Sequence, residues 1–423
     1  MIKIYPYSEM PPIARGETAE SIAAPVAEML ADVRKNGDAA LRAYTERFDG
    51  ASLASLEVTP EEWDAAARFA DAEFIAVLQR AAANIEAFHR HQVRRGFVSN
   101  TENGVVLGQK ITPIARVGLY IPGGTASYPS SALMNAIPAK IAGVRELIMV
   151  TPPDKSGSVN PDILAAAKIA GVDRVFKLGG AQAVAALAYG TESVPRVDKI
   201  VGPGNAYVAE AKRQVYGVVG IDMIAGPSDV LVIADGTCDA VFAAADLLAQ
   251  AEHDKMASAI LVTDSKPLAL AVQAELERQL GALPRADIAR ASIENNGRII
   301  LAESIAHAVD IANELAPEHL ELCVDDPFDW LDSVQNAGSI FLGKNAPEAL
   351  GDYLAGPNHT LPTLGTARFS SPLSVDDFIK KSQFTYFGGA ALNRVGRDVA
   401  LFAEKEGLSA HARSVTKRLE ASK

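Results

Sequence analysis

A first pair of side chains that can bind a metal ion is Gln250 and His253, in the segment LLAQAEH. Residues three apart share a face of a helix, so the amide oxygen of Gln250 and the imidazole of His253 can converge on one ion. In isolation, a glutamine and a histidine at this spacing are more often a buried polar residue and an ordinary histidine. The interpretation as a metal site therefore depends on further ligands elsewhere in the chain.

Further candidate ligands follow in segments with the composition of loops or helix ends. Asp352 opens the segment GDYLAGPNH, which ends at His359, and His411 lies in EGLSAHARS. Functional side chains are concentrated in such segments. An amide oxygen, a carboxylate and two imidazoles suit Zn²⁺ or Mn²⁺, and a set without a thiolate argues against a structural zinc site. By contrast, His89 and His91 fall in a helical pattern, where we expect solvated side chains.

An acid and an imidazole are adjacent at Glu318 and His319, in the segment LAPEHLEL. On a loop, both side chains can reach one substrate: a histidine can remove an alcohol proton as hydride leaves, and a glutamate can activate water against an aldehyde. A solvated surface pair is the alternative. The proline before the pair, together with Leu320 and Leu322 after it, favours a fixed, half-buried position.

The chain has no G-x-G-x-x-G segment, so its glycines alone do not establish NAD binding. Two glycine turns between a strand pattern and a helix pattern are the nearest candidates, LGGAQAV (178–184) and VGPGNAY (201–207). Such a turn presents backbone N–H groups to an anion or phosphate, and ligands of open α/β sheets gather at the carboxyl ends of strands. For either turn alone, an ordinary connection between strand and helix is the better explanation.

Composition and charge exclude several classes of protein. The chain has 423 residues, a formal net charge of −12 and two cysteines, and no run of lysine and arginine stands out. We therefore expect no nucleic-acid partner, no membrane partner and no disulfide framework. The first residues do not resemble a signal peptide, and no apolar run approaches the ~18 residues that span a bilayer. A cytoplasmic protein with more than one lobe is expected.

Alternating strand and helix patterns from residue 112 onward predict parallel sheets with right-handed crossovers, in two doubly wound α/β lobes. Helical patterns between residues 18 and 91 are placed with the later lobe. The predicted parts are an extended N-terminal arm outside the core (1–14), a first α/β lobe with the N-terminal helices (15–111 and 229–373), a second lobe (112–228) and a mostly helical C-terminal dimerisation tail (374–423).

Eight segments together resemble the histidinol dehydrogenase family, over nearly the full length of the chain. They are VGLYIPGGTASYPSSALMNAIPAKIAGV, KLGGAQAVAALAYGT, IVGPGNAYVAEAK, IDMIAGPSDVLVIAD, LLAQAEHD, APEHLEL, GPNHTLPTLGTARFSSPLSV and EGLSAHA. The resemblance implies two Rossmann-like lobes with small terminal segments, in an intertwined homodimer whose C-terminal tail carries His411 into the other subunit's active site. Asp229 stands where many relatives have glutamate, so a carboxylate is kept.

The resemblance also implies which residues form the site. One zinc ion per subunit would be bound by Gln250, His253, Asp352 and His411. The catalytic pair would be Glu318 and His319. The substrate would be bound by Ser228, Gln250, His253, His319, Asp352, Glu406 and His411, with His359 in the matching loop. The contacts with NAD would come from Tyr120, Gln182 and Asn205.

The implied reaction is the last step of histidine biosynthesis, the oxidation of L-histidinol through L-histidinal to L-histidine with NAD as hydride acceptor in both stages. Zinc would orient the imidazole and amine of the substrate, while His319 takes the hydroxyl proton and Glu318 activates water. The alternative is a related zinc and NAD enzyme for another small polar alcohol, such as 2,3-dihydroxypropane-1-sulfonate. The matched motifs contain no added arginine for a sulfonate, and Glu406 suits a cationic amine, so both features favour histidinol.

Overall fold

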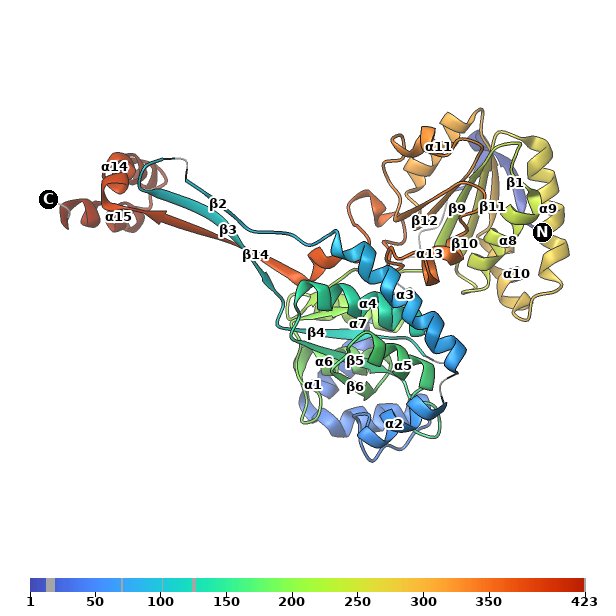
Figure 1. Cartoon of the computed structure of the whole chain (residues 1–423), viewed down its shortest axis with the longest axis horizontal. Coiled ribbons are helices and arrows are strands. Elements are labelled where there is room, and N and C mark those ends of the chain that lie inside the picture. Colours follow the sequence, from blue (N-terminus) through green and yellow to red (C-terminus); the bar gives the residue numbers. More distant parts are fainter. Residues whose placement is uncertain (13–19, 70, 101, 124–126, 422–423) are drawn as a thin grey trace. The chain divides into compact units, whose positions relative to one another are not determined.

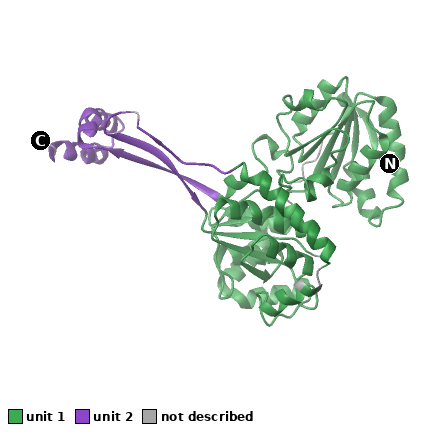
Figure 2. Ribbon diagram, in the orientation of Figure 1, with its two compact units in different colours: residues 1–92, 114–378 green, residues 93–113, 379–423 purple. Residues whose placement is uncertain are grey.

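The short apolar runs after residue 112 form two parallel sheets in the computed structural model, which confirms the predicted α/β fold. The structure describes residues 1–12, 20–69, 71–100, 102–123 and 127–421. They form two compact units: unit 1 (1–92 and 114–378) contains both parallel sheets, and unit 2 (93–113 and 379–423) contains a small antiparallel sheet (Figure 2). None of the described helices is both long and apolar enough to cross a membrane.

The first parallel sheet of unit 1 has the order β6-β5-β4-β7-β8. Its strands are β4 (Arg116–Tyr120), β5 (Glu146–Thr151), β6 (Arg174–Lys177), β7 (Lys199–Val201) and β8 (Gly220–Ile221). Its connecting helices are α4 (Pro129–Ala142), α5 (Pro161–Ile169), α6 (Gly180–Tyr189) and α7 (Ala206–Val215). Strands β4, β5 and β6 and helices α4 to α7 are labelled in Figure 1. Because successive side chains of a strand face opposite sides, Leu147 and Met149 pack with α4 and α5, whereas Ile148 and Val150 pack with α6.

The second parallel sheet of unit 1 has the order β1-β11-β10-β9-β12-β13. Its strands are β1 (Lys3–Pro6), β9 (Asp229–Ala234), β10 (Ser258–Thr263), β11 (Arg298–Leu301), β12 (His319–Cys323) and β13 (Ser339–Leu342). The helices of this part are α8 (Ala240–Ala251), α9 (Lys266–Leu280), α10 (Ala286–Asn295), α11 (Ile305–Leu315), α12 (Phe328–Leu331) and α13 (Glu348–Tyr353). Val230 and Val232 face the core with α8, and Leu231 and Ile233 face the core with α11.

The N-terminal helices pack on the β4–β8 sheet, not on the later lobe with which the sequence analysis places them. These helices are α1 (Glu20–Asp49), α2 (Pro60–Phe69) and α3 (Ala72–Arg90). Val26 and Leu30 of α1 share a core with α6, and Leu78 and Ile85 of α3 share a core with α4. An amphipathic pattern shows that a helix has a buried face but not which sheet covers it. Helix α1 has a kink at Gly37, whose φ is 52°.

The first residues are extended, as predicted, but they are not an arm outside the core. Strand β1 pairs in parallel with β11 at the edge of the second sheet, and Ile2 is buried in the core of that sheet. Four residues are too few to show the alternation that marks a strand in a sequence. Residues 13–14 of the predicted arm lie outside the described residues.

Unit 2 begins its C-terminal half with a strand rather than a helix. Strand β14 (Ile379–Phe387) pairs antiparallel with β3 (Val105–Pro113), which also pairs with β2 (Phe97–Ser99). Two helices follow, α14 (Gly389–Lys405) and α15 (Ser409–Ala421), and they share a small core of alanines. Nearly every residue of β14 is exposed in the chain, so the strand has no alternating apolar face to recognise in the sequence.

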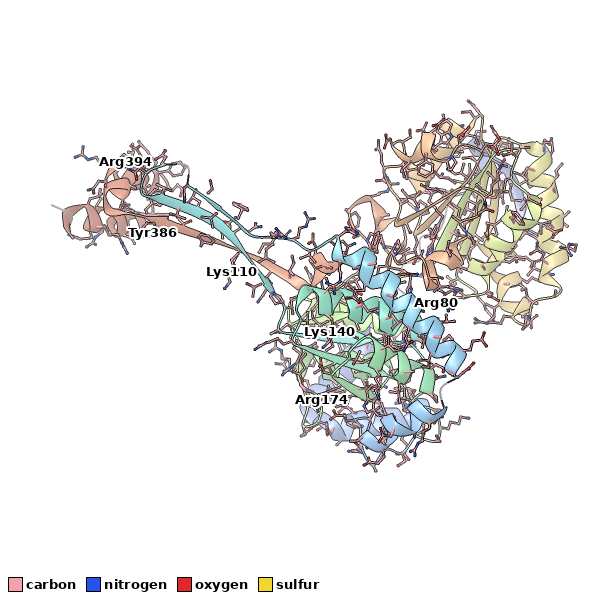
Figure 3. All side chains as sticks on the ribbon, viewed as in Figure 1. Arg80, Lys110, Lys140, Arg174, Tyr386 and Arg394 are labelled. Carbon is pink, nitrogen blue, oxygen red and sulfur yellow. The ribbon has the colours of Figure 1, made fainter. Side chains whose placement is uncertain are left out.

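Short irregular helices and local ion pairs complete the chain. The single-turn 3-10 helices are η1 (Tyr7–Glu9), η2 (Thr366–Arg368) and η3 (Val375–Phe378). Of the side chains labelled in Figure 3, Lys140 pairs with Asp173 at 2.7 Å and Arg174 pairs with Glu57 at 2.6 Å. Such partly exposed pairs contribute at most about 1 kcal/mol each and mark no site.

Candidate active site

Glu318 and His319 lie at the amino end of β12, beside the amino end of β9. His319 is the first residue of β12, so the pair is at a strand start and not within a loop as predicted from the sequence. The backbone N–H of Glu318 donates to Oδ1 of Asp229 at 2.8 Å, and the N–H of Asp229 donates to Oε2 of Glu318 at 3.1 Å. The two side chains of the pair are each about 5% exposed, which makes them more buried than expected. This reciprocal bonding fixes the pair to the sheet.

The surroundings of His319 favour a neutral imidazole with one nitrogen available as a base. Its Nδ1 is 3.2 Å from the carbonyl oxygen of Asp229, which can only accept a hydrogen bond, so Nδ1 carries the proton. The other nitrogen, Nε2, lies 4.0 Å from Oδ1 of Asp352. Burial lowers the pKa of His319 to about 4 and outweighs the opposite effect of the Asp352 charge. Nε2 can therefore accept a proton at neutral pH.

The carboxyl of Glu318 is in an environment that penalises its charge. Burial raises the pKa of Glu318 well above its ordinary value, and the nearby Asp229 carboxylate raises it further. The N–H of Asp229 and the hydroxyl of Ser228 act in the opposite direction by hydrogen bonding. Once ionised, such a carboxylate is a stronger base than a solvated one, which suits the activation of water.

The candidate metal ligands of unit 1 lie around this pair. Gln250 is fully buried in α8, whereas His253 is exposed in the turn that follows the helix, so the two do not share a continuous helix as the spacing predicts. Asp352 lies on α13 with its side chain 17% exposed. The charges of Asp352 and His253 both influence the pKa values of His319 and His359, which brings these groups into one region.

No three histidine, cysteine, aspartate or glutamate side chains among the described residues are grouped closely enough to hold a metal ion. Of the predicted ligands in unit 1, His253 is the one imidazole and Asp352 is the one carboxylate, and the third ligand is the amide of Gln250. The remaining predicted ligand, His411, and the predicted substrate contact Glu406 are exposed in unit 2. An amide oxygen, an imidazole and a carboxylate are donors that suit zinc and leave room for a further ligand, so the residues of unit 1 fit an incomplete zinc site.

A cavity of about 140 Å³ adjoins Glu318. Its walls come from the turn after β7, the segment before β9 and the loop after α13: Gly202, Pro203, Gly204, Asp222, Met223, Ala225, Gly226, Ser228, Glu318, His359, Thr360, Leu361 and Thr363. The buried Nε2 of His359 has no hydrogen-bond partner among the described residues. An unpaired buried imidazole nitrogen costs free energy unless a ligand or water satisfies it, so the cavity suits a polar ligand.

The residues predicted to contact NAD lie at the carboxyl ends of the β4–β8 sheet. Tyr120 ends β4, and its hydroxyl accepts the N–H of Gly180 at 3.0 Å. Gln182 is buried in the first turn of α6, and its Oε1 has no partner in the described part of the chain. Asn205 caps α7 by accepting the N–H of Val208 at 3.1 Å. The ends of β4 and β7, with Tyr120 and Asn205, flank the point where strand order reverses, which is the usual ligand position in such sheets.

The close approach of the turn after β7 to β4 requires glycine. Gly202 has a φ of +117°, and a Cβ atom on it would lie 2.1 Å from the carbonyl oxygen of Tyr120. The turn can therefore pass close to the strand end only without a side chain.

One group at this site was not predicted from the sequence, and one histidine outside it was predicted wrongly. Glu348, the first residue of α13, is 2% exposed and has an Oε1 3.9 Å from Nδ1 of His319. Its position four residues before Asp352 is the signal that was available, because such residues share a helix face. His89, predicted to be solvated, is completely buried and bonds Oε1 of Gln92 through Nδ1 at 2.7 Å.

A buried acid–imidazole pair, beside a cavity that also reaches the glycine turn of a doubly wound sheet, defines an α/β enzyme with acid–base chemistry. The sequence model of the family described as histidinol dehydrogenase matches residues 14–419. The chain is 58% identical over 411 residues to the histidinol dehydrogenase of Syntrophotalea carbinolica, covering 96% of this chain and 95% of the relative. It is 56% identical over 412 residues to that of Geobacter sulfurreducens, covering 96% of each.

Structural comparison agrees with the sequence comparison. The crystal structure of histidinol dehydrogenase from Elizabethkingia anophelis matches with a TM-score of 0.93 and 40% identity, covering 99% of this chain and 98% of that one. The chain belongs to the histidinol dehydrogenase family.

Proposed function

We propose that this protein oxidises L-histidinol to L-histidine through L-histidinal, with NAD⁺ as the hydride acceptor in both stages, as the last step of histidine biosynthesis in the cytoplasm. The observation that carries the proposal is the fixed tautomer of His319 next to the buried carboxyl of Glu318. One group is suited to take a proton from an alcohol, and the other is suited to take a proton from water.

In the first stage, His319 accepts the hydroxyl proton of histidinol at Nε2 while the hydride of the CH₂OH carbon passes to NAD⁺. The Nδ1 hydrogen bond to the Asp229 carbonyl holds the ring in place during this transfer. Because His319 is neutral before the reaction, it can receive the proton at neutral pH. The products are histidinal, NADH and a protonated His319.

In the second stage, Glu318 removes a proton from the water that attacks the aldehyde carbon, and protonated His319 returns its proton to the aldehyde oxygen. The resulting hydrate loses a hydride to a second NAD⁺, and His319, now neutral again, takes the hydroxyl proton. Glu318 lines the cavity, so it is within reach of a ligand bound there. The predicted outcome is one L-histidine, two NADH and the corresponding protons for each histidinol and water consumed.

We propose that the resident metal is one zinc ion per subunit, held by Gln250, His253 and Asp352 together with His411 of the partner subunit. When bound, zinc supplies positioning of the substrate through its imidazole and amine nitrogens. Positioning is enough because His319 and Glu318 provide the proton transfers. In this proposal, Ser228 and His359 of the same chain complete the substrate contacts, together with Glu406 of the partner subunit.

We further propose a homodimer in which each site uses residues from both chains. Both His411 and Glu406 belong to unit 2, and both residues are exposed in the single chain. Mixed dimers of a His319→Asn chain and a His411→Asn chain should recover activity, because one of the two sites then has a full set of residues. Mixed dimers that form but remain inactive would contradict a shared site.

The proposed NAD contacts are Tyr120, Gln182 and Asn205. The buried, unpaired Oε1 of Gln182 offers an acceptor to a ligand group such as an amide or a hydroxyl. The exposed N-cap at Asn205 lies beside the free N–H groups of α7, which favour an anion such as a phosphate.

The decisive experiment is to measure NADH formed per L-histidinol by the purified protein, with the metal content determined on the same sample. We expect a ratio of two, and loss of activity when zinc is removed by a chelator and return when zinc is added. A zinc-loaded protein that ignores L-histidinol but reduces NAD⁺ with another small alcohol, such as 2,3-dihydroxypropane-1-sulfonate, would contradict the proposal.

A further inference from the structure

Glu348 is a buried carboxylate beside the site for which the reaction scheme above has no use. It is 2% exposed, and no lysine or arginine of the described chain forms an ion pair with it. A buried carboxylate without a cation is costly, and an apolar side chain of similar volume would usually serve stability better. Its presence at this position therefore requires an explanation other than packing.

The carboxylate of Glu348 faces the terminal amide of Gln250. With the amide nitrogen on that side, the nitrogen donates to Oε1 at 2.8 Å and to Oε2 at 3.1 Å. Against the ionised carboxylate, whose oxygens can only accept, the opposite orientation would leave the amide oxygen of Gln250 with no hydrogen bond to either oxygen. The carboxylate thus selects one of the two orientations of the amide.

This selection matters because only one end of an amide can bind a metal ion. The oxygen of Gln250 is a ligand, whereas its NH₂ group has no lone pair to offer. If the nitrogen is held by Glu348, the oxygen is the end that remains for a cation. Partners that orient metal ligands in this way typically change metal affinity by 10–100-fold when they are removed.

We infer that Glu348 is a positioning residue that holds the Gln250 amide with its oxygen available to the zinc ion, and so sets the zinc affinity of the site. The inference rests on the proposed function, which supplies the zinc ion. Glu348 lies on the same short helix as Asp352, one turn earlier, so α13 contributes both a proposed ligand and the group that orients another.

The neighbouring acid Glu321 provides a matched control. Glu321 is also buried, but its Oε1 accepts the N–H of Glu348 at 2.7 Å and so caps the start of α13. Glutamine at position 321 would keep that acceptor and has no hydrogen bond to Gln250 to disturb. A general effect of exchanging a buried carboxyl group for an amide would appear in Glu321→Gln, whereas an effect through the Gln250 amide would not.

The test measures zinc affinity of the full-length protein by competition with a chromogenic chelator. We expect Glu348→Leu to weaken zinc binding by ~10–100-fold. Glu348→Gln should stay within a few-fold of wild type, because its amide oxygen can still accept from the Gln250 nitrogen. Glu321→Gln should match wild type. In a Gln250→Ala background, Glu348→Leu should cause no further loss, because the side chain through which Glu348 acts is absent.

Several outcomes would overturn the inference. A loss with Glu348→Leu that persists in full in the Gln250→Ala background would mean that Glu348 acts on the metal directly. Equal losses for Glu348→Gln and Glu348→Leu would mean that charge matters and amide orientation does not. Unchanged affinity in a folded Glu348→Leu protein would mean that the role is structural only.

Glu348→Asp covers the case in which Glu348→Leu does not fold. It shortens the side chain by one methylene and should weaken zinc several-fold, again only when Gln250 is present. Equal affinity of Glu348→Asp and wild type would contradict the inference. NADH production from L-histidinol by the wild-type protein tests the proposed function separately, since it does not depend on how Glu348 acts.

Discussion

The two parallel sheets of unit 1 have the same strand order but bring the proposed functional residues to opposite ends. In chain order, β4–β8 and β9–β13 are both arranged third, second, first, fourth, fifth. The first sheet places Tyr120 and the glycine turn at Gly202 at strand carboxyl ends. The second sheet places Asp229 and the Glu318–His319 pair at strand amino ends. Equal topology therefore does not imply equal use of the sheet.

The carboxyl end of the second sheet is closed by its own side chains. Lys344 pairs with Asp325 and donates to Oγ1 of Thr237 at 2.6 Å. Thr237 donates to Asp325 at 2.9 Å, and the N–H of Asp325 donates to Asp235 at 3.0 Å. These groups occupy the position next to β9 and β12 where a doubly wound sheet usually binds its ligand. They are bonded to one another by hydrogen bonds and an ion pair.

The chemistry of the two ends explains why each suits its role. Backbone N–H groups and glycine turns approach a nucleotide closely without adding a titratable group. A proton acceptor instead needs a side chain with a fixed direction. The starts of β9 and β12 provide this, because the backbone N–H of Asp229 bonds the side chain of Glu318 and the backbone N–H of Glu318 bonds the side chain of Asp229. One cavity is lined from both sheets, by Gly202 and by Glu318. The proposed cofactor contacts and the proposed proton-transfer groups nevertheless lie on different sheets, so each function can be altered separately.

The largest expected effect is at the amino end of β12. His319→Asn should reduce kcat for histidinol oxidation by ~10²–10⁴-fold, the usual contribution of a general base. The affinity for NAD should stay unchanged, because the proposed contacts lie on the other sheet. Steady-state rates and NAD titration of the same protein would measure both. A large loss of NAD affinity would show that the two ends are not separable.

The strands that organise these ends are readable in the sequence because they are buried on both faces. In β5 and β9, five of six residues are buried, so each strand appears as a short apolar run between turns. Strand β14 has no such run, and its pairing with β3 joins residues far apart in the sequence. The placement of α1 and α3 was predicted wrongly because their partners are likewise distant.

The candidate site was predictable where a motif is local and not where partners are remote. Glu318 and His319 are adjacent in the sequence, but their anchor Asp229 is on another strand. The buried state of His89 depends in part on Asn358, whose amide lies 3.5 Å from its Nε2. Neither contact has a signal in the spacing of residues.

The next largest effect should come from backbone packing at the same amino end. A Cβ atom on Gly338 would lie 2.5 Å from the carbonyl oxygen of Glu318, which is also the acceptor of the Ser339 N–H at 2.9 Å. Gly338→Ala should displace the catalytic pair and lower kcat by ~10²-fold, the cost of a misplacement of about 1 Å.

Gly236→Ala is the matched control for Gly338→Ala. Gly236 follows the carboxyl end of β9, and a Cβ atom there would meet Ser265 at ordinary contact distances, 3.6 Å from Oγ and 3.8 Å from Cβ. It should retain wild-type kcat and NAD affinity. Equal losses in both variants would indicate general sensitivity of the lobe to added volume.

A smaller effect is expected at the carboxyl ends of the first sheet. Gln182→Met keeps the length of the buried side chain but removes the Oε1 that is proposed to contact NAD. Loss of one such hydrogen bond should raise the dissociation constant for NAD by ~10-fold, with little change in kcat at saturating NAD. Calorimetric or fluorescence titration would measure the constant. Unchanged NAD affinity would remove Gln182 from the cofactor site.

The smallest effect concerns the pH dependence of stability at His89, which packs on neither proton-transfer group. Burial lowers the pKa of His89 below its ordinary value, so at mildly acidic pH the unfolded chain binds more protons than the folded chain. The free energy of unfolding should therefore fall as the pH decreases from 7 through the ordinary pKa of histidine.

His89→Gln cannot take up that proton, although it loses the bond to Gln92, which is worth about 1 kcal/mol. The variant should be less stable than wild type at pH 7, and the difference should shrink as the pH falls. Denaturant unfolding at several pH values would show this, and a constant difference would mean that His89 does not titrate on unfolding.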